Sequence, residues 1–302
     1  LKHLPEVQIL SLDAQNRKDP KARAEIMQES DLVVLCLPDE VAKEAIYIAD
    51  HLTKKNFRIL DASTAHRVAE GWVYGFPEMD NKQTEAIQKS FRVSNPGCYP
   101  TGVIALLRPL IKAGMLPQDY PLTINAVSGY SGGGRSMIET YEPVRKAPNF
   151  ELYALSLNHK HLPEIMTYTG LTRRPIFVPS VGNFRQGMLV SIPIHLDTLP
   201  SKPKLSDIRN TYLSFYNEYQ TVRVLPETEK EIQRLDPETL NNTDNLELFV
   251  CGSLNNPQAV LVARLDNLGK GAAGSALQNI KLMLGLHATS SSAEPTKDDG
   301  QR

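Results

Sequence analysis

Short apolar runs alternate with stretches of helical apolar spacing in the first part of the chain. The runs, which predict buried strands, span residues 7–12, 31–38 and 57–63. The helical stretches begin at Pro20, a residue suited to a first helical turn, and at Asp39. This order of elements predicts a parallel, doubly wound α/β sheet whose ligands bind beyond the carboxyl ends of its strands.

The second part of the chain has a different pattern, with many strands and few helices. Apolar runs predict strands over residues 122–129, 175–182, 187–196, 221–226, 246–253 and 259–268. One helix is predicted over about residues 204–219, and small residues from Gly269 to Gly274 precede an amphipathic helix. The pattern favours an α+β domain with a mixed, largely antiparallel sheet.

The composition argues against several classes of partner. The chain has 302 residues, 41% of them hydrophobic and 22% charged, so it can bury a substantial core, and two domains are expected. Its formal net charge of -1 provides no basic field for nucleic acid or an anionic membrane. Cys36, Cys98 and Cys251 are too few and too scattered for a disulfide framework, so a reducing compartment, the cytoplasm, is expected.

The two ends of the chain differ from the rest. The opening LKHLP is predicted to end a helix, and no glycine-rich turn precedes the first predicted strand. A nucleotide-binding sheet should begin with a strand and such a turn, so we expect both upstream of Leu1. The tail after Leu286 is too polar to pack and is expected to fray.

Charged residues after the first predicted strand bear on the cofactor. Arg17 and Lys18 suit the 2′-phosphate of NADP, whereas Asp13 at the tip of the strand suits the free ribose hydroxyl of NAD. Solvated loop cations are the alternative for Arg17 and Lys18, and the sequence leaves the choice open. Further cofactor contacts are expected from residues at the ends of the following strands, namely Leu37, Pro38 and Ser63.

One cysteine lies between turn formers and a helix. In SNPGCYPTG a proline and a glycine before Cys98 predict a turn, and helical apolar spacing continues from Thr101. Cys98 is therefore expected at a helix N-terminus, where free amides and the helix dipole lower a thiol pKa and suit a nucleophile. A buried structural cysteine is the alternative, and it is our interpretation of Cys36 and Cys251.

The segment SNPGCYPTG resembles the signature of the N-acetyl-gamma-glutamyl-phosphate reductases, which are relatives of aspartate-semialdehyde dehydrogenase. Further motifs agree with that family in their order along the chain: DASTAHR at 61–67, YGFPEM at 74–79, GYSGGGR at 129–135, NHKHLPEI at 158–165 and DNLGKGAAGSALQN at 266–279. They cover nearly the whole chain and are similar to the shorter of the family's two types. The resemblance implies NADPH-dependent reduction of N-acetyl-gamma-glutamyl phosphate in arginine biosynthesis.

The resemblance also implies a covalent mechanism. The Cys98 thiolate attacks the acyl phosphate, inorganic phosphate leaves, and hydride from NADPH reduces the resulting thioester. Arg67 offers a bidentate fork for the substrate's phosphate, with a surface or interdomain ion pair as the alternative. Ser131 is implied as a substrate contact and Arg135 as a second anion contact.

Glycines in GYSGGGR let the backbone approach a ligand closely, although three glycines can also simply make a tight turn. The cofactor contacts implied on this side of the site are Gly132, Gly133, Gly134 and Asn267.

The motif NHKHLPEI is expected to supply the group that transfers protons. An imidazole with a pKa near neutral can take the thiol proton and later assist at the aldehyde oxygen. His159 and His161 would point to the same side of an extended segment, so the sequence does not decide between them. Glu164 is expected to orient one imidazole or to bind the substrate. The His-x-His pair could also bind zinc, but no third ligand follows at a suitable spacing, and no metal is expected.

The domains, subunits and competing functions follow from the same resemblance. Residues 1–100 and 266–302 are expected to form a Rossmann-like NADP-binding domain, and residues 101–265 a catalytic and oligomerisation domain. A homodimer or a homotetramer acting on a small-molecule substrate is expected. Two alternatives stay open: a sister acyl-phosphate reductase such as aspartate-semialdehyde dehydrogenase, and a non-catalytic relative that has lost its nucleotide turn.

Overall fold

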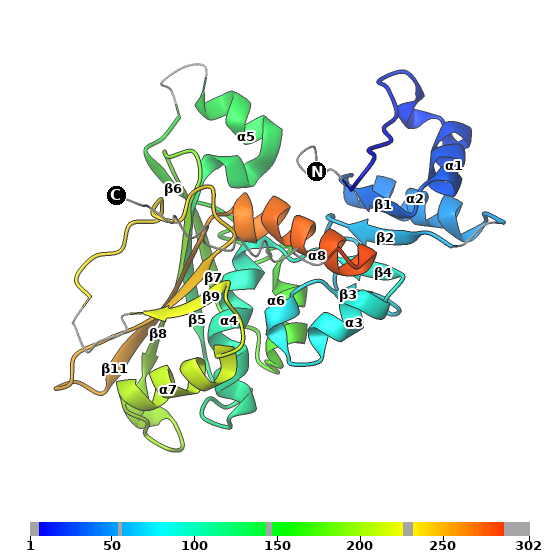
Figure 1. Ribbon diagram of the computed structural model, residues 1–302. Coiled ribbons are helices and arrows are strands. Elements are labelled where there is room, and N and C mark those ends of the chain that lie inside the picture. The colour runs from blue at the N-terminus through cyan, green and yellow to red at the C-terminus, as the bar shows by residue number, and fades with distance from the viewer. Residues whose placement is uncertain (1–5, 54–55, 143–146, 226–231, 287–302) are drawn as a thin grey trace, which may run out of the picture.

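The computed structural model describes residues 6–53, 56–142, 147–225 and 232–286, which are arranged around two sheets (Figure 1). The predictions for the opening residues 1–5 and for the tail beyond Leu286 lie outside the described residues. Within the described part, no helix is both long and apolar enough to cross a membrane.

The first sheet is parallel and carries helices on both faces. Its strands lie in the order β1-β2-β4-β3, with the bounds β1 Leu32–Leu35, β2 Arg58–Asp61, β3 Val73–Tyr74 and β4 Arg92–Ser94. Ile59 packs with α1 (Pro20–Glu29) and α2 (Asp39–Asp50), whereas Leu60 packs with α3 (Gln83–Lys89) and α8 (Gly274–Leu284). Successive strand residues point to opposite faces, so helices cover both sides, and the predicted doubly wound sheet is confirmed.

The strand predicted over residues 7–12 is not formed. The segment pairs with none of the described strands, and Ile9 and Leu10 are exposed. An apolar run becomes a strand only where a neighbouring strand shares its backbone hydrogen bonds, and this prediction was wrong because no described strand pairs with the segment. A short helical turn, η1 (Asn16–Lys18), leads into α1, and Asp19 caps α1 by accepting the Lys21 N–H.

The second sheet is mixed and largely antiparallel, as predicted. Its order is β6-β7-β5-β8-β11-β10-β9, and only the pairs β5/β7 and β9/β10 among these neighbours are parallel. The bounds are β5 Thr123–Gly129, β6 Phe150–Leu152, β7 Ile176–Gly182, β8 Met188–His195, β9 Val222–Leu225, β10 Leu246–Cys251 and β11 Gln258–Leu265. Residues of β5, β8 and β11 face one large core, which contains most of α4 (Cys98–Lys112) and part of α7 (Leu205–Tyr216).

Helix α4 is held in that core by hydrogen bonds that compensate for a proline. Pro109 has no N–H to donate to the Ala105 carbonyl one turn earlier, and this would leave a buried acceptor unpaired. Tyr216 of α7 donates its hydroxyl to that carbonyl at 2.9 Å, and Tyr212 donates to the Leu106 carbonyl at 2.7 Å. These bonds fix the helix that carries Cys98 at its first residue.

The remaining helices connect the strands. They are η2 Pro77–Met79, η3 Tyr130–Gly133, α5 Gly134–Tyr141, α6 Leu162–Thr169, η4 Leu196–Thr198 and the π-helical turn η5 Gly269–Ala273. Figure 1 shows η5 and α8 running from the second sheet toward the first, and α8 contacts α3 and β2 there. The chain's last described helix therefore returns to the first sheet.

Candidate active site

Cys98 lies at the point where α4 begins, as the sequence predicts. Gly97 is the residue before the helix, and Cys98 is partly buried, with Gly271 of η5 packed against it. Burial raises the pKa of the Cys98 thiol above its ordinary value, although the Arg67 charge and the Tyr99 N–H oppose this. The prediction of a lowered thiol pKa is therefore wrong for the free protein, because loss of solvent outweighs the helix N-terminus.

The buried carboxylate of Glu164 links α6 to three other segments of the chain beside the Cys98 thiol. Glu164 of α6 accepts from Arg67 Nη1 at 2.6 Å, from the Tyr74 hydroxyl at 2.8 Å and from the Gly97 N–H at 3.1 Å. Its side chain is 2% exposed, and burial raises its pKa against the lowering effect of Arg67. These bonds go to a guanidinium, a phenol and an amide rather than to an imidazole, so Glu164 orients Arg67 and the turn before Cys98.

Arg67 is itself buried in this network. Its Nη2 donates to the Ala62 carbonyl at 3.3 Å, and its Nε has no partner among the described residues. Tyr168 donates its hydroxyl to the Arg67 carbonyl and stacks on Tyr74 with ring centroids 3.8 Å apart. The structure therefore shows the ion pair that was the alternative for Arg67, in a position next to Cys98.

The two histidines lie in a turn that leads into α6, not in an extended segment. His161 immediately precedes α6 and is 6% exposed, with Nδ1 buried and without a partner among the described residues. The His159 Nδ1 accepts the His161 backbone N–H at 3.1 Å, and the two rings are 4.7 Å apart. His161 is therefore the inner imidazole and His159 the outer one.

Both imidazoles are neutral in the free protein at neutral pH. Burial lowers the pKa of His161 well below 6.5, and the nearby charges of Arg67 and Lys160 lower it further. Burial also lowers the pKa of His159, to about 4. A neutral imidazole can accept a proton, so the site contains a proton acceptor beside a protonated thiol.

The glycine-rich segment 131–134 forms η3 and the start of α5. Asn267 ties this segment to the second sheet, since its amide donates to Ser131 Oγ at 2.9 Å and its oxygen accepts the Gly187 N–H at 2.8 Å. Gly134 has a φ of 71°, a left-handed conformation that glycine adopts without strain. Arg135 is exposed and pairs with Glu139 along α5, and within the described residues it makes no contact with the Cys98 cluster. Ser131 and Asn267 are thus brought together with Gly132 and Gly133 in one loop cluster.

The predicted cofactor residues of the first sheet lie at or near its carboxyl edge. Leu37 and Pro38 lie between β1 and α2. Ser63 donates its N–H and hydroxyl to the buried Asp61 carboxylate at 2.9 and 2.7 Å, which shapes the loop leading to Arg67. Arg17 and Lys18 are exposed on η1.

Sequence reasoning missed several residues of this cluster. Tyr74 and Gly271 belong to motifs that were recognised, but neither had a role assigned. Tyr99 follows Cys98 directly, is buried, and accepts from the Tyr153 hydroxyl at 3.3 Å. The described residues contain no group of three His, Cys, Asp or Glu side chains that could hold a metal ion.

Comparisons with known proteins agree with this geometry. Residues 5–87 match the family described as "Semialdehyde dehydrogenase, NAD binding domain", and residues 98–267 match "Semialdehyde dehydrogenase, dimerisation domain". The chain is 48% identical over 283 residues to an N-acetyl-gamma-glutamyl-phosphate reductase from Chelativorans sp., which covers 92% of this chain and 90% of that protein. It is also 48% identical to an N-acetyl-gamma-glutamyl-phosphate reductase 2 from Pseudomonas putida, over 93% of this chain and 90% of that one.

The chain belongs to the N-acetyl-gamma-glutamyl-phosphate reductase family.

Solved structures show the fold that this reductase family shares with its relatives. Aspartate semialdehyde dehydrogenase II from Vibrio cholerae superposes with a TM-score of 0.62 at 13% identity, over 86% of this chain and 82% of that one. Aspartate semialdehyde dehydrogenase with NADP from Candida albicans gives a TM-score of 0.56 at 15% identity, over 85% and 78%. At such identities the likeness concerns the fold alone.

Replacing Gly97 with alanine is expected to lower the activity of this reductase-family chain by about a hundredfold, because a small misplacement of reacting groups has costs of that order. A Cβ there would lie 2.6 Å from Arg67 Nη1, 2.8 Å from Glu164 Oε1 and 2.9 Å from His161 Nε2. The Gly97 φ of -75° suits any residue, so the effect would be steric. Turnover is measured alongside thermal melting. If the variant folds and turns over at the wild-type rate, the side chains of Arg67, Glu164 and His161 can shift without loss of activity, and the prediction is contradicted.

The rate of Cys98 alkylation by iodoacetamide in the free protein is expected to rise about tenfold between pH 7 and 8. The thiol pKa is raised above 9.0, so only a small fraction is thiolate in this range and that fraction grows with pH. Labelling at Cys98 is followed by mass spectrometry, with Cys98→Ser as the blank. A rate that levels off below pH 8 would contradict the raised pKa.

Proposed function

We propose that the chain reduces N-acetyl-gamma-glutamyl phosphate to N-acetylglutamate semialdehyde with NADPH, releasing phosphate, as a step of arginine biosynthesis. The observation that carries the proposal is the 48% identity, over 92% of the chain, to a relative named for that reaction. The site supplies suitable chemistry, because a thiol at a helix N-terminus lies beside a neutral imidazole and a buried arginine.

In this proposal Cys98 is the nucleophile. Its proton passes to a neutral imidazole as the sulfur attacks the acyl carbon, and phosphate leaves to give a thioester on Cys98. When bound, NADPH supplies the hydride that reduces this thioester. The thiohemiacetal that results then collapses to the aldehyde, and the protonated His161 returns its proton to the departing Cys98 sulfur, which restores the thiol. Arg67, held by Glu164, places a positive charge beside the developing thiolate and the leaving phosphate.

The described residues fit NADP better than NAD. The Asp13 carboxylate accepts the N–H groups of Gln15 and Asn16 at 2.9 and 2.8 Å, so it already caps its own turn. Arg17 and Lys18 on that turn are exposed and suit a 2′-phosphate. We therefore propose that these two cations give the preference for NADP. Further cofactor contacts are proposed at the carboxyl edge of the first sheet, from Leu37, Pro38 and Ser63. The contacts proposed for the nicotinamide end are Gly132, Gly133, Gly134 and Asn267.

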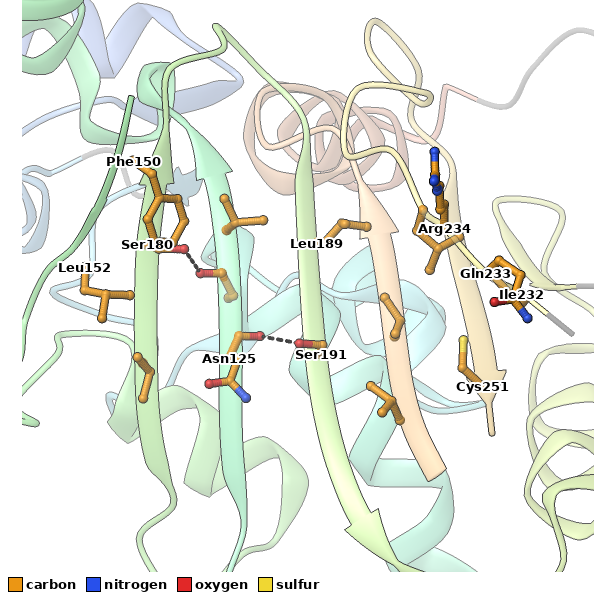
Figure 2. Close-up of a pocket in the computed structure, with 16 residues that line it drawn as sticks. Asn125, Phe150, Leu152, Ser180, Leu189, Ser191, Ile232, Gln233, Arg234 and Cys251 are labelled. Carbon is orange, nitrogen blue, oxygen red and sulfur yellow. Dashed lines mark hydrogen bonds between the residues drawn. The ribbon is translucent and has the colours of Figure 1, made fainter. Parts of the chain in front are cut away.

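Residues 1–100 with 266–302, and residues 101–265, are proposed as the two domains. The second of them is proposed to join two copies of the chain into a dimer or a dimer of dimers. One face of its sheet is open, with a hollow of about 540 Å³, and Figure 2 shows the side chains that line it. Phe150 and Leu152 are 57% and 48% exposed on this face, and residues 98–267 match a family described as a dimerisation domain. A sedimentation-equilibrium experiment that found only monomer would contradict the proposed dimer.

The cytoplasm is the proposed location. The three cysteines are unpaired, as expected where thiols stay reduced.

The reaction is best tested backwards. N-acetylglutamate semialdehyde, phosphate and NADP are mixed with the protein, and the absorbance of the reduced nicotinamide is followed. Phosphate-dependent reduction with this substrate, and not with aspartate semialdehyde, is expected. Turnover of aspartate semialdehyde alone would instead assign the sister reaction, and no turnover with any substrate, together with no NADPH binding in a titration, would indicate a non-catalytic relative.

A further inference from the structure

A second ion pair is buried near Cys98, and the mechanism above does not use it. Lys270 Nζ lies 2.7 Å from Glu78 Oε1, and their side chains are each 1% exposed. Gln278 accepts from the ammonium at 2.8 Å and donates to Glu78 at 2.9 Å, while Thr221 donates to the same carboxylate oxygen at 2.5 Å. The Lys270 ammonium also lies 5.6 Å from the centre of the Phe76 ring.

Stability alone does not account for this pair. Removing two charges from water is costly, and buried ion pairs are commonly no more stabilising than apolar residues of the same volume. One Glu78 oxygen, Oε2, also has no partner among the described residues, which adds to the cost. A buried pair of this kind is better explained by what it holds in place.

The ion pair holds the turn η5 (Gly269–Ala273) against Cys98, and this turn forms one wall of the site. Lys270 belongs to the π-helical turn η5, and π-helical turns are rare and often found at functional sites. The next residue, Gly271, is so close that a Cβ on it would lie 2.8 Å from Cys98 Cβ. The Asn95 amide donates to the Ala272 carbonyl at 3.1 Å, so the same turn is also tied to the loop before Cys98.

We propose that Lys270 and Glu78 are positioning residues for the Cys98 thiol. By fixing η5, they keep Gly271 against the Cys98 backbone and Cβ, which closes one side of the cysteine and directs its sulfur toward the substrate. Glu78 comes from the short helix η2 and Gln278 from α8, so the pair joins three segments that are distant in sequence. This inference rests on the proposed role of Cys98 as the nucleophile.

The test is the double variant Lys270→Met with Glu78→Gln. Methionine keeps the apolar stem under Phe76, and glutamine can still accept from Thr221, so neither leaves a buried unpaired charge. We expect kcat of the reverse reaction to fall about 10-fold to 100-fold, with KM for phosphate and NADP changed by less than about threefold. Iodoacetamide should label Cys98 severalfold faster, with Cys36 and Cys251 unchanged, because only the wall beside Cys98 has loosened.

Two further variants keep the test decisive. Gly271→Ala alters the wall without touching the ion pair, and a similar fall in kcat with altered labelling at Cys98 alone is expected. Glu247→Gln with Arg264→Met removes another well-buried ion pair, between β10 and β11, and should leave the Cys98 labelling rate unchanged.

The outcomes separate the positioning role from a structural one. Wild-type kcat and labelling in the folded double variant, or wild-type kcat in Gly271→Ala, would overturn the proposal. Faster labelling of all three cysteines with a lowered melting temperature would also overturn it, since the pair would then only support the fold. If the wild-type protein turns over no substrate, the proposed function fails, while the labelling of Cys98 still tests the positioning.

Discussion

Cys98→Ser is expected to lower the rate of phosphate-dependent NADP reduction by on the order of 10⁴-fold. A serine hydroxyl fits the same space, but its proton is far harder to remove than that of a thiol. The surroundings make this worse, because burial disfavours a negative charge at this position and already raises the pKa of the thiol. The reverse assay with N-acetylglutamate semialdehyde gives the rate, and mass spectrometry of the trapped acyl-enzyme shows whether a thioester forms.

Cys251→Ser is the matched control for this prediction. Cys251 is also a free cysteine of the chain, but it lies on β10 at the open face of the second sheet. Its replacement should leave turnover within about twofold of the wild type, as for most changes away from a site. Residual activity of Cys98→Ser above about 1% of wild type would contradict covalent catalysis through this residue.

The order of strands and helices could be predicted because local signals determine it. Pro20 predicts the start of α1 and an apolar run predicts β1, and both elements form at the predicted places. The segment 7–12 has the same kind of apolar run but pairs with no strand among the described residues. Whether an apolar run becomes a strand depends on pairing, which the run itself does not encode.

The sequence predicted the position of Cys98 at the start of a helix but not the direction of its pKa shift. The helix N-terminus at Cys98 was foreseen, yet the sign of its pKa shift depends on burial by segments such as η5, far along the chain. Likewise the partner of Arg67 is 97 residues away, and no local pattern connects it with Glu164. One local signal was overlooked: Pro163 followed by Glu164 is typical of a first helical turn, and it places the two histidines in a turn before α6.

His161→Asn is expected to lower kcat by about 10²-fold to 10⁴-fold, the range for loss of a group that transfers protons. His161 is the buried imidazole, and its Nε2 reaches the space above Gly97, the residue before Cys98. Its side chain makes no capping bond to α6, so asparagine should not unfold that helix. KM for phosphate should change much less than kcat, because Arg67 and Glu164 remain in place.

His159→Asn provides the comparison that assigns the role. The structural bond of His159 is the one that its Nδ1 accepts from the His161 N–H, and an asparagine oxygen can accept the same N–H. We therefore expect His159→Asn to retain more than about a tenth of the wild-type kcat. A larger loss in His159→Asn than in His161→Asn would transfer the proton-transfer role to the outer imidazole. The pKa of both rings lies below 6.5 in the folded protein, so neither should gain a proton above that pH, and the histidines should cause no loss of rate between pH 7 and 8.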